Sequence, residues 1–140
     1  MKIKPHIITT FIMVFCTIIL ANAQQMTPEQ VVEKSMESYN HRDIDGFMSV
    51  VDPHISFHNF SDGSTTIQGA AACKTLYSAL FAASPNLHSI VLNRTIFGNK
   101  VIDHESITGR NGLDEIIELV LIYEVKNEKI VKITMLRKEL

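Results

Sequence analysis

The segment from Ile55 to Phe60 carries the residue best suited to chemistry, His58, among aromatic neighbours. Its apolar and polar residues alternate with a period of two, which is typical of a half-buried strand. A desolvated histidine has a lowered pKa, so a neutral His58 could accept a proton from a substrate. The alternative is a histidine that packs and forms hydrogen bonds without reacting, and the sequence leaves both interpretations open.

A second set of ionisable residues, Asp103, His104 and Glu105, lies on a later predicted strand. His104 is the candidate polar partner of His58 in proton transfer. Together these side chains could be imagined as metal ligands, but no His-x-x-x-His or Cys-x-x-Cys spacing is present. We therefore expect no metal site, and the sequence indicates no cofactor.

The turn residues Gly98-Asn99 predict how this strand pairs with the one before it. A two-residue hairpin would place Arg94 opposite Asp103 and Asn93 opposite His104, with the two pairs on opposite faces of the sheet. Arg94 and Asp103 are expected to form an ordinary cross-strand ion pair, which contributes little where it is exposed. The sequence does not show which of the two faces lines the interior.

The elements that must position these residues are helices followed by a run of strands. Thr27, Pro28 and Gln30 form the start signal of a first helix, which ends near Asn40. Asp43 can cap a second, short helix that Asp52-Pro53 terminates. A third helix is predicted over 70–83, and strands over 55–60, 87–97, 101–108, 116–125 and 130–136. This order indicates an α+β fold with helices on one face of the sheet.

The last long strand shows which of its faces is covered. Apolar or aromatic residues occupy every second position from Ile117 to Val125, a set that includes Leu121 and Tyr123. This set is expected to face the helices. The opposite face carries Glu118 and Glu124, and we expect the protein to form a homodimer through it.

The sequence resembles the SnoaL-like, ketosteroid isomerase-like branch of the nuclear transport factor 2-like superfamily. The resemblance begins with the run from Tyr39 to Ser61, which contains the helix end, the turn and the first strand. It continues through Asn86-Leu87-His88, Asn93-Arg94, Gly98 to Glu105 and Ile122 to Val125. It implies a cone-shaped, curved antiparallel sheet with three N-terminal helices packed on its concave face. The cavity of the cone is expected to be lined by Tyr39, Phe57, Phe60, Leu121 and Tyr123.

The resemblance to ketosteroid isomerase also implies roles for particular positions. The carboxylate base of that enzyme falls on His58, which can still move a proton. Its oxyanion-hole tyrosine falls on Ser35 and its protonated aspartate approximately on Leu121, and neither can stabilise an enolate in the same way. Authentic ketosteroid isomerisation is therefore not expected, although Tyr39 or Tyr123 could serve as the donor.

The first 23 residues form a separate segment. Lys2 and Lys4 precede an apolar run, and Ala21-Asn22-Ala23 follows it, a pattern typical of a secretory signal cleaved before Gln24. The alternative, a membrane anchor, needs about 20 apolar residues, and the run is shorter. We therefore expect an exported protein, periplasmic or secreted, without a stable membrane anchor after processing. Residues 24–140 then form one SnoaL-like domain.

Charge and cysteine content limit the partners further. The chain has a formal net charge of −2, loss of Lys2 and Lys4 makes it more acidic, and the remaining basic residues form no stripe. Nucleic acid is therefore not an expected partner. Cys73 would be the one cysteine left after cleavage, and its apolar neighbours indicate a core residue and not a nucleophile.

Two functions from different classes remain open. The first is an exported domain whose apolar pocket binds a small hydrophobic molecule. The alternative is an isomerase, cyclase or dehydratase of the ketosteroid isomerase type, with His58 as general base and His104 or a tyrosine as polar partner.

Overall fold

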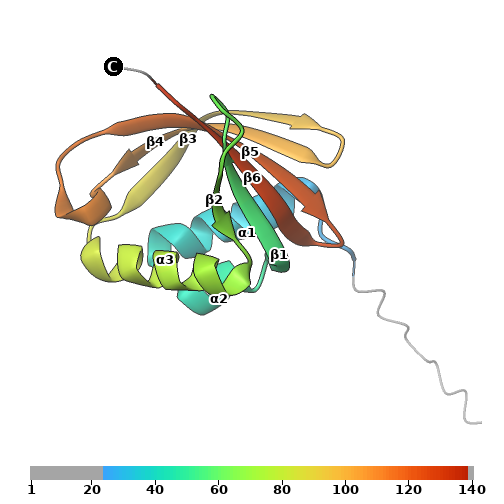
Figure 1. The fold of residues 1–140 in the computed structure, drawn as a ribbon, viewed down its shortest axis with the longest axis horizontal. Coiled ribbons are helices and arrows are strands. Elements are labelled where there is room, and N and C mark those ends of the chain that lie inside the picture. The colour runs from blue at the N-terminus through green and yellow to red at the C-terminus, as the bar shows by residue number, and fades with distance from the viewer. Residues whose placement is uncertain (1–23, 139–140) are drawn as a thin grey trace, which may run out of the picture.

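A curved sheet covers three helices in the computed structural model, which describes residues 24–138 (Figure 1). The helices are α1 (Pro28–His41), α2 (Ile44–Met48) and α3 (Ala70–Ala83), and a short 3-10 turn, η1, spans Arg110–Gly112. The strands are β1 (Val51–Asn59), β2 (Thr65–Gln68), β3 (His88–Phe97), β4 (Lys100–Thr108), β5 (Ile117–Lys126) and β6 (Lys129–Arg137). The predicted α+β class with helices against the concave face is confirmed.

The six strands form one sheet in the order β2-β1-β6-β5-β4-β3. All neighbouring strands run antiparallel except β1 and β6, which pair in parallel. The Gly98-Asn99 hairpin is confirmed, and it places Arg94 opposite Asp103 and Asn93 opposite His104 as predicted.

Helix α1 begins where the sequence predicts and positions the residues that later face the cavity. The Thr27 side chain accepts from the backbone of Gln30, whose own side chain accepts from the backbone of Thr27, so the capping box is complete. The helix ends at Arg42, which adopts a left-handed conformation with φ of 56°. Tyr39 and Asn40 therefore lie in its last turn.

The segment after α2 differs from the prediction. Asp52-Pro53 does not end a helix, because α2 already ends at Met48 and β1 begins at Val51. Pro53 is tolerated in this strand because the register with β6 shifts between Val51 and Ser56, so no regular ladder bond needs its missing N–H. The short strand β2 was not predicted, since three of its four residues are exposed and give no clear alternation.

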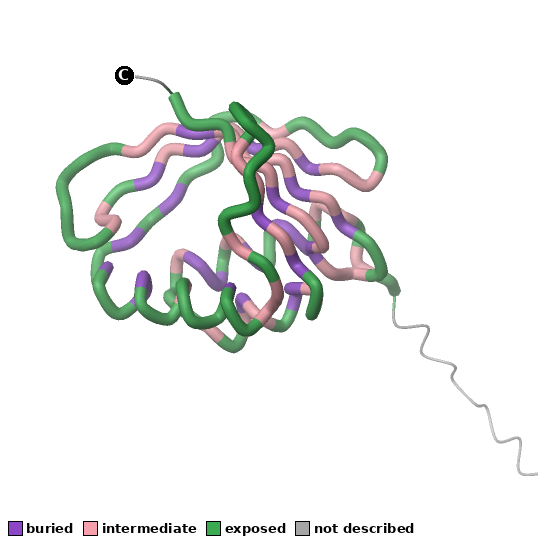
Figure 2. Tube along the Cα trace, viewed as in Figure 1, coloured by how far each residue is buried: buried purple, intermediate pink, exposed green. Residues whose placement is uncertain are grey.

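Alternate residues of the long strands face the helices. We call this side of the sheet the inner face and the opposite side the outer face. On β5 the inner positions Leu119, Tyr123 and Val125 are buried, as predicted, while Glu118 and Glu124 lie on the outer face. Figure 2 shows the buried positions recurring along the strands and on the helix sides turned toward them. The core therefore lies between the inner face and the helices.

The predicted signal segment 1–23 lies outside the described residues. Within residues 24–138, none of the helices has both the length and the apolar character that a membrane crossing requires. Cys73 is buried as a free thiol, which agrees with its predicted place in the core.

Candidate functional site

A cavity of about 40 Å³ lies between α1, α3 and the inner face of the sheet. Aromatic rings form much of its wall, and Phe47 stacks on Tyr77 with ring centroids 4.4 Å apart. Its lining residues are Ser35, Met36, Tyr39, Phe47, Phe57, Tyr77, Glu105, Ile107, Arg110, Leu119, Leu121, Tyr123, Ile133 and Met135.

Glu105 places a carboxyl group in this mostly apolar wall. The Ser89 hydroxyl donates to its Oε2 at 2.8 Å, and the Tyr123 hydroxyl donates to its Oε1 at 3.0 Å. Burial raises the pKa of Glu105 to about 7, because the charged form loses its water, although both hydrogen bonds act in the opposite direction. A carboxyl group with this pKa can both accept and donate a proton near neutral pH.

Ser89 is fixed in turn by the last turn of α1. The Asn40 side chain accepts from the Ser89 backbone N–H at 2.7 Å and donates to the Ser89 carbonyl at 2.9 Å. This two-bond contact joins α1 to the start of β3. It holds the Ser89 hydroxyl in the position from which it donates to Glu105.

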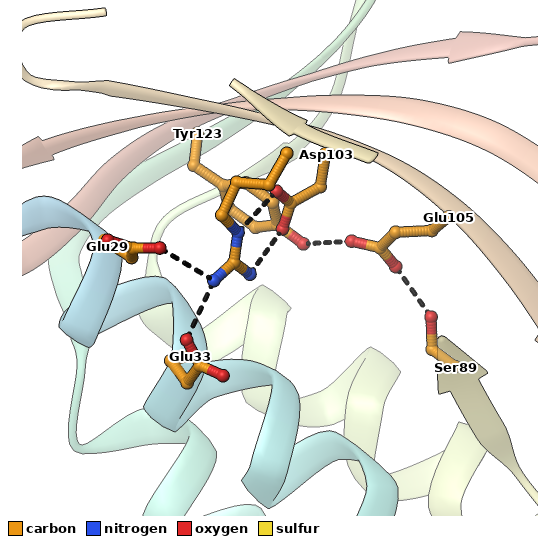
Figure 3. A network of polar contacts seen from close by, with 7 residues as sticks. Glu29, Glu33, Ser89, Asp103, Glu105 and Tyr123 are labelled. Carbon is orange, nitrogen blue, oxygen red and sulfur yellow. Dashed lines mark hydrogen bonds and ion pairs between the residues drawn. The ribbon is translucent and has the colours of Figure 1, made fainter. Parts of the chain in front are cut away.

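A second polar network lies beside Glu105 on the inner face (Figure 3). Asp103 is fully buried, and its two oxygens accept from the Arg94 guanidinium at 2.8 Å each. Arg94 also pairs with Glu33 at 2.9 Å and with Glu29 at 3.9 Å on α1. The predicted ion pair between Arg94 and Asp103 therefore lies on the inner face. This answers the question that the sequence left open, namely which of the two cross-strand pairs faces the interior.

The three tyrosines of the cavity wall keep their protons. Burial raises the pKa of Tyr39 to about 12, and it raises the pKa values of Tyr77 and Tyr123 well above their usual value. All three hydroxyls can therefore donate at neutral pH. Tyr123 already donates to Glu105, whereas the buried Tyr39 hydroxyl donates to no acceptor among the described residues.

Four of the predicted pocket residues, Tyr39, Phe57, Leu121 and Tyr123, lie in the cavity wall. Phe60 does not, since it follows the end of β1 and is 58% exposed.

His58 also lies outside the cavity, because consecutive strand residues point to opposite faces and Phe57 faces inward. Its Nε2 is 2.9 Å from the Ser56 hydroxyl on the outer face. Phe60 and His58 therefore do not line the cavity, contrary to the prediction. His58 is thus not placed to act as a base on a molecule bound there.

His104 lies on the outer face as well. Its Nε2 is 2.7 Å from Glu118 Oε1, and Lys138 approaches the other oxygen of the same carboxylate at 3.2 Å. The two histidines of the predicted catalytic pair therefore do not meet in the cavity. Residues 24–138 contain no group of three or more His, Cys, Asp or Glu side chains suited to hold a metal ion.

Glu105, Ser89, Tyr77 and Arg110 are cavity or network residues that the sequence did not reveal. A signal for Glu105 was present, because it shares the parity of Val101 and Ile107 on β4, and an acid between two apolar residues of one parity indicates burial. Arg110 lies in a loop and shows no such pattern.

Comparison with known families decides which family this chain represents. The model of the SnoaL-like domain matches residues 32–133. The chain belongs to the SnoaL-like domain family. A comparison with curated proteins finds no match for this SnoaL-like domain.

Solved structures share the fold at low sequence identity. An uncharacterised cystatin-fold protein from Novosphingobium aromaticivorans has a TM-score of 0.73 and 20% identity, covering 80% of this chain and 99% of its own. A candidate ketosteroid isomerase from Kribbella flavida has a TM-score of 0.69 and 15% identity, covering 81% and 78%. A candidate SnoaL-like polyketide cyclase from Jannaschia sp. CCS1 has a TM-score of 0.65 and 15% identity, covering 79% and 85%. These likenesses show the fold of this SnoaL-like domain and not its activity.

Proposed function

We propose that the cavity binds a small, largely apolar carbonyl compound and that Glu105 moves a proton at its α-carbon. The observation that carries this proposal is the buried Glu105 carboxyl, held by Ser89 and Tyr123, with a pKa raised to about 7. This residue replaces His58 in the isomerase, cyclase or dehydratase alternative that the sequence left open.

The proton transfer needs a base and a donor to the carbonyl oxygen. Ionised Glu105 would take a proton from the carbon beside the carbonyl, and the electron pair of that C–H bond would pass to the carbonyl oxygen as an enolate. The Tyr39 hydroxyl, which donates to no other group among the described residues, is available to donate to this oxygen. Return of the proton from Glu105 to the same or another carbon completes an exchange or an isomerisation.

The size of the cavity limits the ligand. A space of about 40 Å³ does not accommodate a steroid without large movement of its walls. The half-buried Met36 and Met135 are flexible side chains that can move to admit a somewhat larger molecule. Compounds of four to six carbons are therefore the appropriate probes.

The test is exchange of α-protons in deuterated water, followed by NMR, with butanone, cyclopentanone and 2-oxobutyrate. We expect exchange above buffer with at least one compound, and a loss of about a hundredfold or more in Glu105→Gln. His58→Ala and His104→Ala are the matched controls and are expected to keep the wild-type rate. No exchange above buffer by the wild type, with an apolar probe still bound in the cavity, would leave the non-catalytic binding function instead.

Export and dimer formation are further proposals that rest on the sequence. Intact-mass analysis of native protein should find a chain that begins at Gln24, and retention of residues 1–23 would contradict cleavage. Sedimentation at micromolar concentration should find a homodimer through the outer face, whereas a monomer alone would contradict it.

A further inference from the structure

Arg110 and Tyr39 line the cavity without the acceptors that comparable groups have elsewhere in the protein. None of the ion pairs among residues 24–138 involves the Arg110 guanidinium. The buried Tyr39 hydroxyl donates to no acceptor within the same residues. A buried, unsatisfied polar group costs about 1 to 3 kcal/mol, so a donor left without an acceptor indicates that a ligand supplies one.

The two donors are neighbours. Both residues line the same cavity, and the positive charge of Arg110 and a hydrogen bond from its side chain both lower the pKa of Tyr39 against the effect of burial, so the guanidinium lies close to this hydroxyl. Arg110 and Glu105, by contrast, form no ion pair among the described residues, although both line the cavity. The cavity therefore has an acidic group and a basic group that do not neutralise each other by direct contact.

The backbone around Arg110 is built to hold it in this position. Gly109 has φ of 69°, and a Cβ at this residue would lie 2.2 Å from the Asn86 carbonyl oxygen, so only glycine fits. On the other side, the Asn111 backbone N–H donates to the buried Ser84 hydroxyl at 2.8 Å. The turn η1 is thus fixed to the end of α3, and Arg110 projects from a restrained segment.

Arg94 shows what a structural arginine looks like in this protein. It has two hydrogen bonds to Asp103 and further contacts with Glu33 and Glu29. Arg110 has no such carboxylate although it lies in a mostly apolar cavity wall. An arginine in this setting is well suited to receive a carboxylate from a ligand, because its planar fork matches that group with two parallel hydrogen bonds.

We propose that Arg110 and Tyr39 form an anion-binding end of the cavity, and that the ligand is a small 2-oxo acid. This inference rests on the proposed function and names its substrate class. The carboxylate lies on Arg110 and the ketone oxygen accepts from Tyr39. Because these two donors are neighbours, the two acceptors must be close together in the ligand, as they are in a 2-oxo acid. The remaining carbons lie against the apolar wall, with the α-carbon within reach of Glu105.

Binding of 2-oxobutyrate and of its neutral isostere 2-oxobutyramide, measured by NMR titration, separates this idea from non-specific binding. Wild-type protein should bind the carboxylate about tenfold or more tightly than the amide, as expected for a charge-assisted hydrogen-bonded pair. Arg110→Gln should abolish this preference, and Arg110→Lys should restore part of it because the charge returns without the fork. Lys126→Gln, which removes an exposed basic residue at the end of β5, is the control for loss of charge and should keep the preference.

Tyr39→Phe provides a second variant that keeps the ring and removes only the hydroxyl. It should weaken binding of both compounds, because both contain the ketone, while the preference for the carboxylate persists. Equal binding of acid and amide by the wild type, or an unchanged preference in Arg110→Gln, would overturn the anion-binding end.

These outcomes are distinct from failure of the proposed proton transfer. Preference for the carboxylate without α-proton exchange would reject catalysis and keep the anion-binding end. Exchange on neutral ketones without any preference for the carboxylate would keep the proposed proton transfer and reject the anion-binding end.

Discussion

The two faces of strand β4 carry ionisable residues side by side in sequence, yet their chemistry differs. Asp103 and Glu105 point to the inner face, where they are buried against the helices. His104, between them, points to the outer face and pairs there with the half-exposed Glu118. Burial raises the pKa of Glu105 to about 7, whereas the hydrogen bond from His104 lowers the pKa of Glu118. Placement on one face or the other thus decides which of these two carboxyl groups, Glu105 or Glu118, can exchange a proton near neutral pH.

The inner face also uses its two acids differently. Asp103 is fully paired with Arg94, which makes it part of the structure, while Glu105 has only the neutral donors Ser89 and Tyr123. A carboxylate paired with a guanidinium stays ionised, but one among neutral donors in an apolar wall retains its proton more readily. The difference indicates that a reactive acid on this fold needs burial without a counter-ion.

The largest expected effect comes from breaking the buried pair. Arg94→Met should lower the free energy of unfolding by roughly 3 to 5 kcal/mol, because Asp103 is left charged and unpaired in the interior. Denaturant unfolding measures this change. The double variant Arg94→Met/Asp103→Leu removes both charges and should recover most of the loss. A single variant as stable as the wild type would show that the pair is not structurally important.

Stability should also depend on pH through Glu105. Its pKa is about 7 in the folded protein against an ordinary value of 4.5, so the folded state holds the proton more tightly. The resulting stabilisation is complete below about pH 4.5 and is lost as pH rises through about 7, on the order of 3 kcal/mol in total. Unfolding measured across this range should show the decline, and Glu105→Gln should lack this component. An equal decline in both proteins would assign it to another group.

A smaller effect is expected from the hydrogen bond that Ser89 donates. Ser89→Ala removes a contact that favours the ionised form, so the pKa of Glu105 should rise further, by about one unit, since a hydrogen bond to a charged group is worth about 1.5 kcal/mol. The pH midpoint of α-proton exchange would move upward by the same amount. A midpoint that stays in place would mean that Tyr123 alone holds the carboxyl group.

The outer face should tolerate change with the smallest effect. Glu118→Gln removes the partner of His104 and Lys138, but solvent screens these charges, so the melting temperature should not change measurably. The rate of α-proton exchange should also stay at the wild-type value. A marked loss of activity in this variant would return the outer face to consideration as a site.

Much of the fold follows from local signals in the sequence. The capping box at Thr27 starts α1, and the Gly98-Asn99 turn sets the register that pairs Arg94 with Asp103. The path of β1 through Pro53 could not be predicted in this way. It depends on parallel pairing with β6, a strand about 80 residues later in the chain, which no local pattern encodes.

The site was harder to predict because neighbouring residues on a strand face opposite sides. Phe57 and His58 cannot both line the cavity, and the parity of Ile55 and Phe57 would have excluded His58 from it. On β4, Val101 and Ile107 share the parity of Glu105, whereas Ile102 is the one apolar residue that shares the parity of His104, so the two faces differ by a single apolar residue. The packing of α1 against the sheet confirms which of them is the inner face.

Direct titration of the Glu105 carboxyl carbon by NMR tests the central claim, that burial in the cavity gives this residue a proton exchangeable near neutral pH. Comparison of the wild type with Glu105→Gln identifies its resonance. We predict a midpoint near pH 7, with Tyr123→Phe moving it upward because a hydrogen bond to the ionised form is lost. A midpoint at the ordinary value of a glutamate, near 4.5, would contradict the assignment of Glu105 as the group that moves the proton.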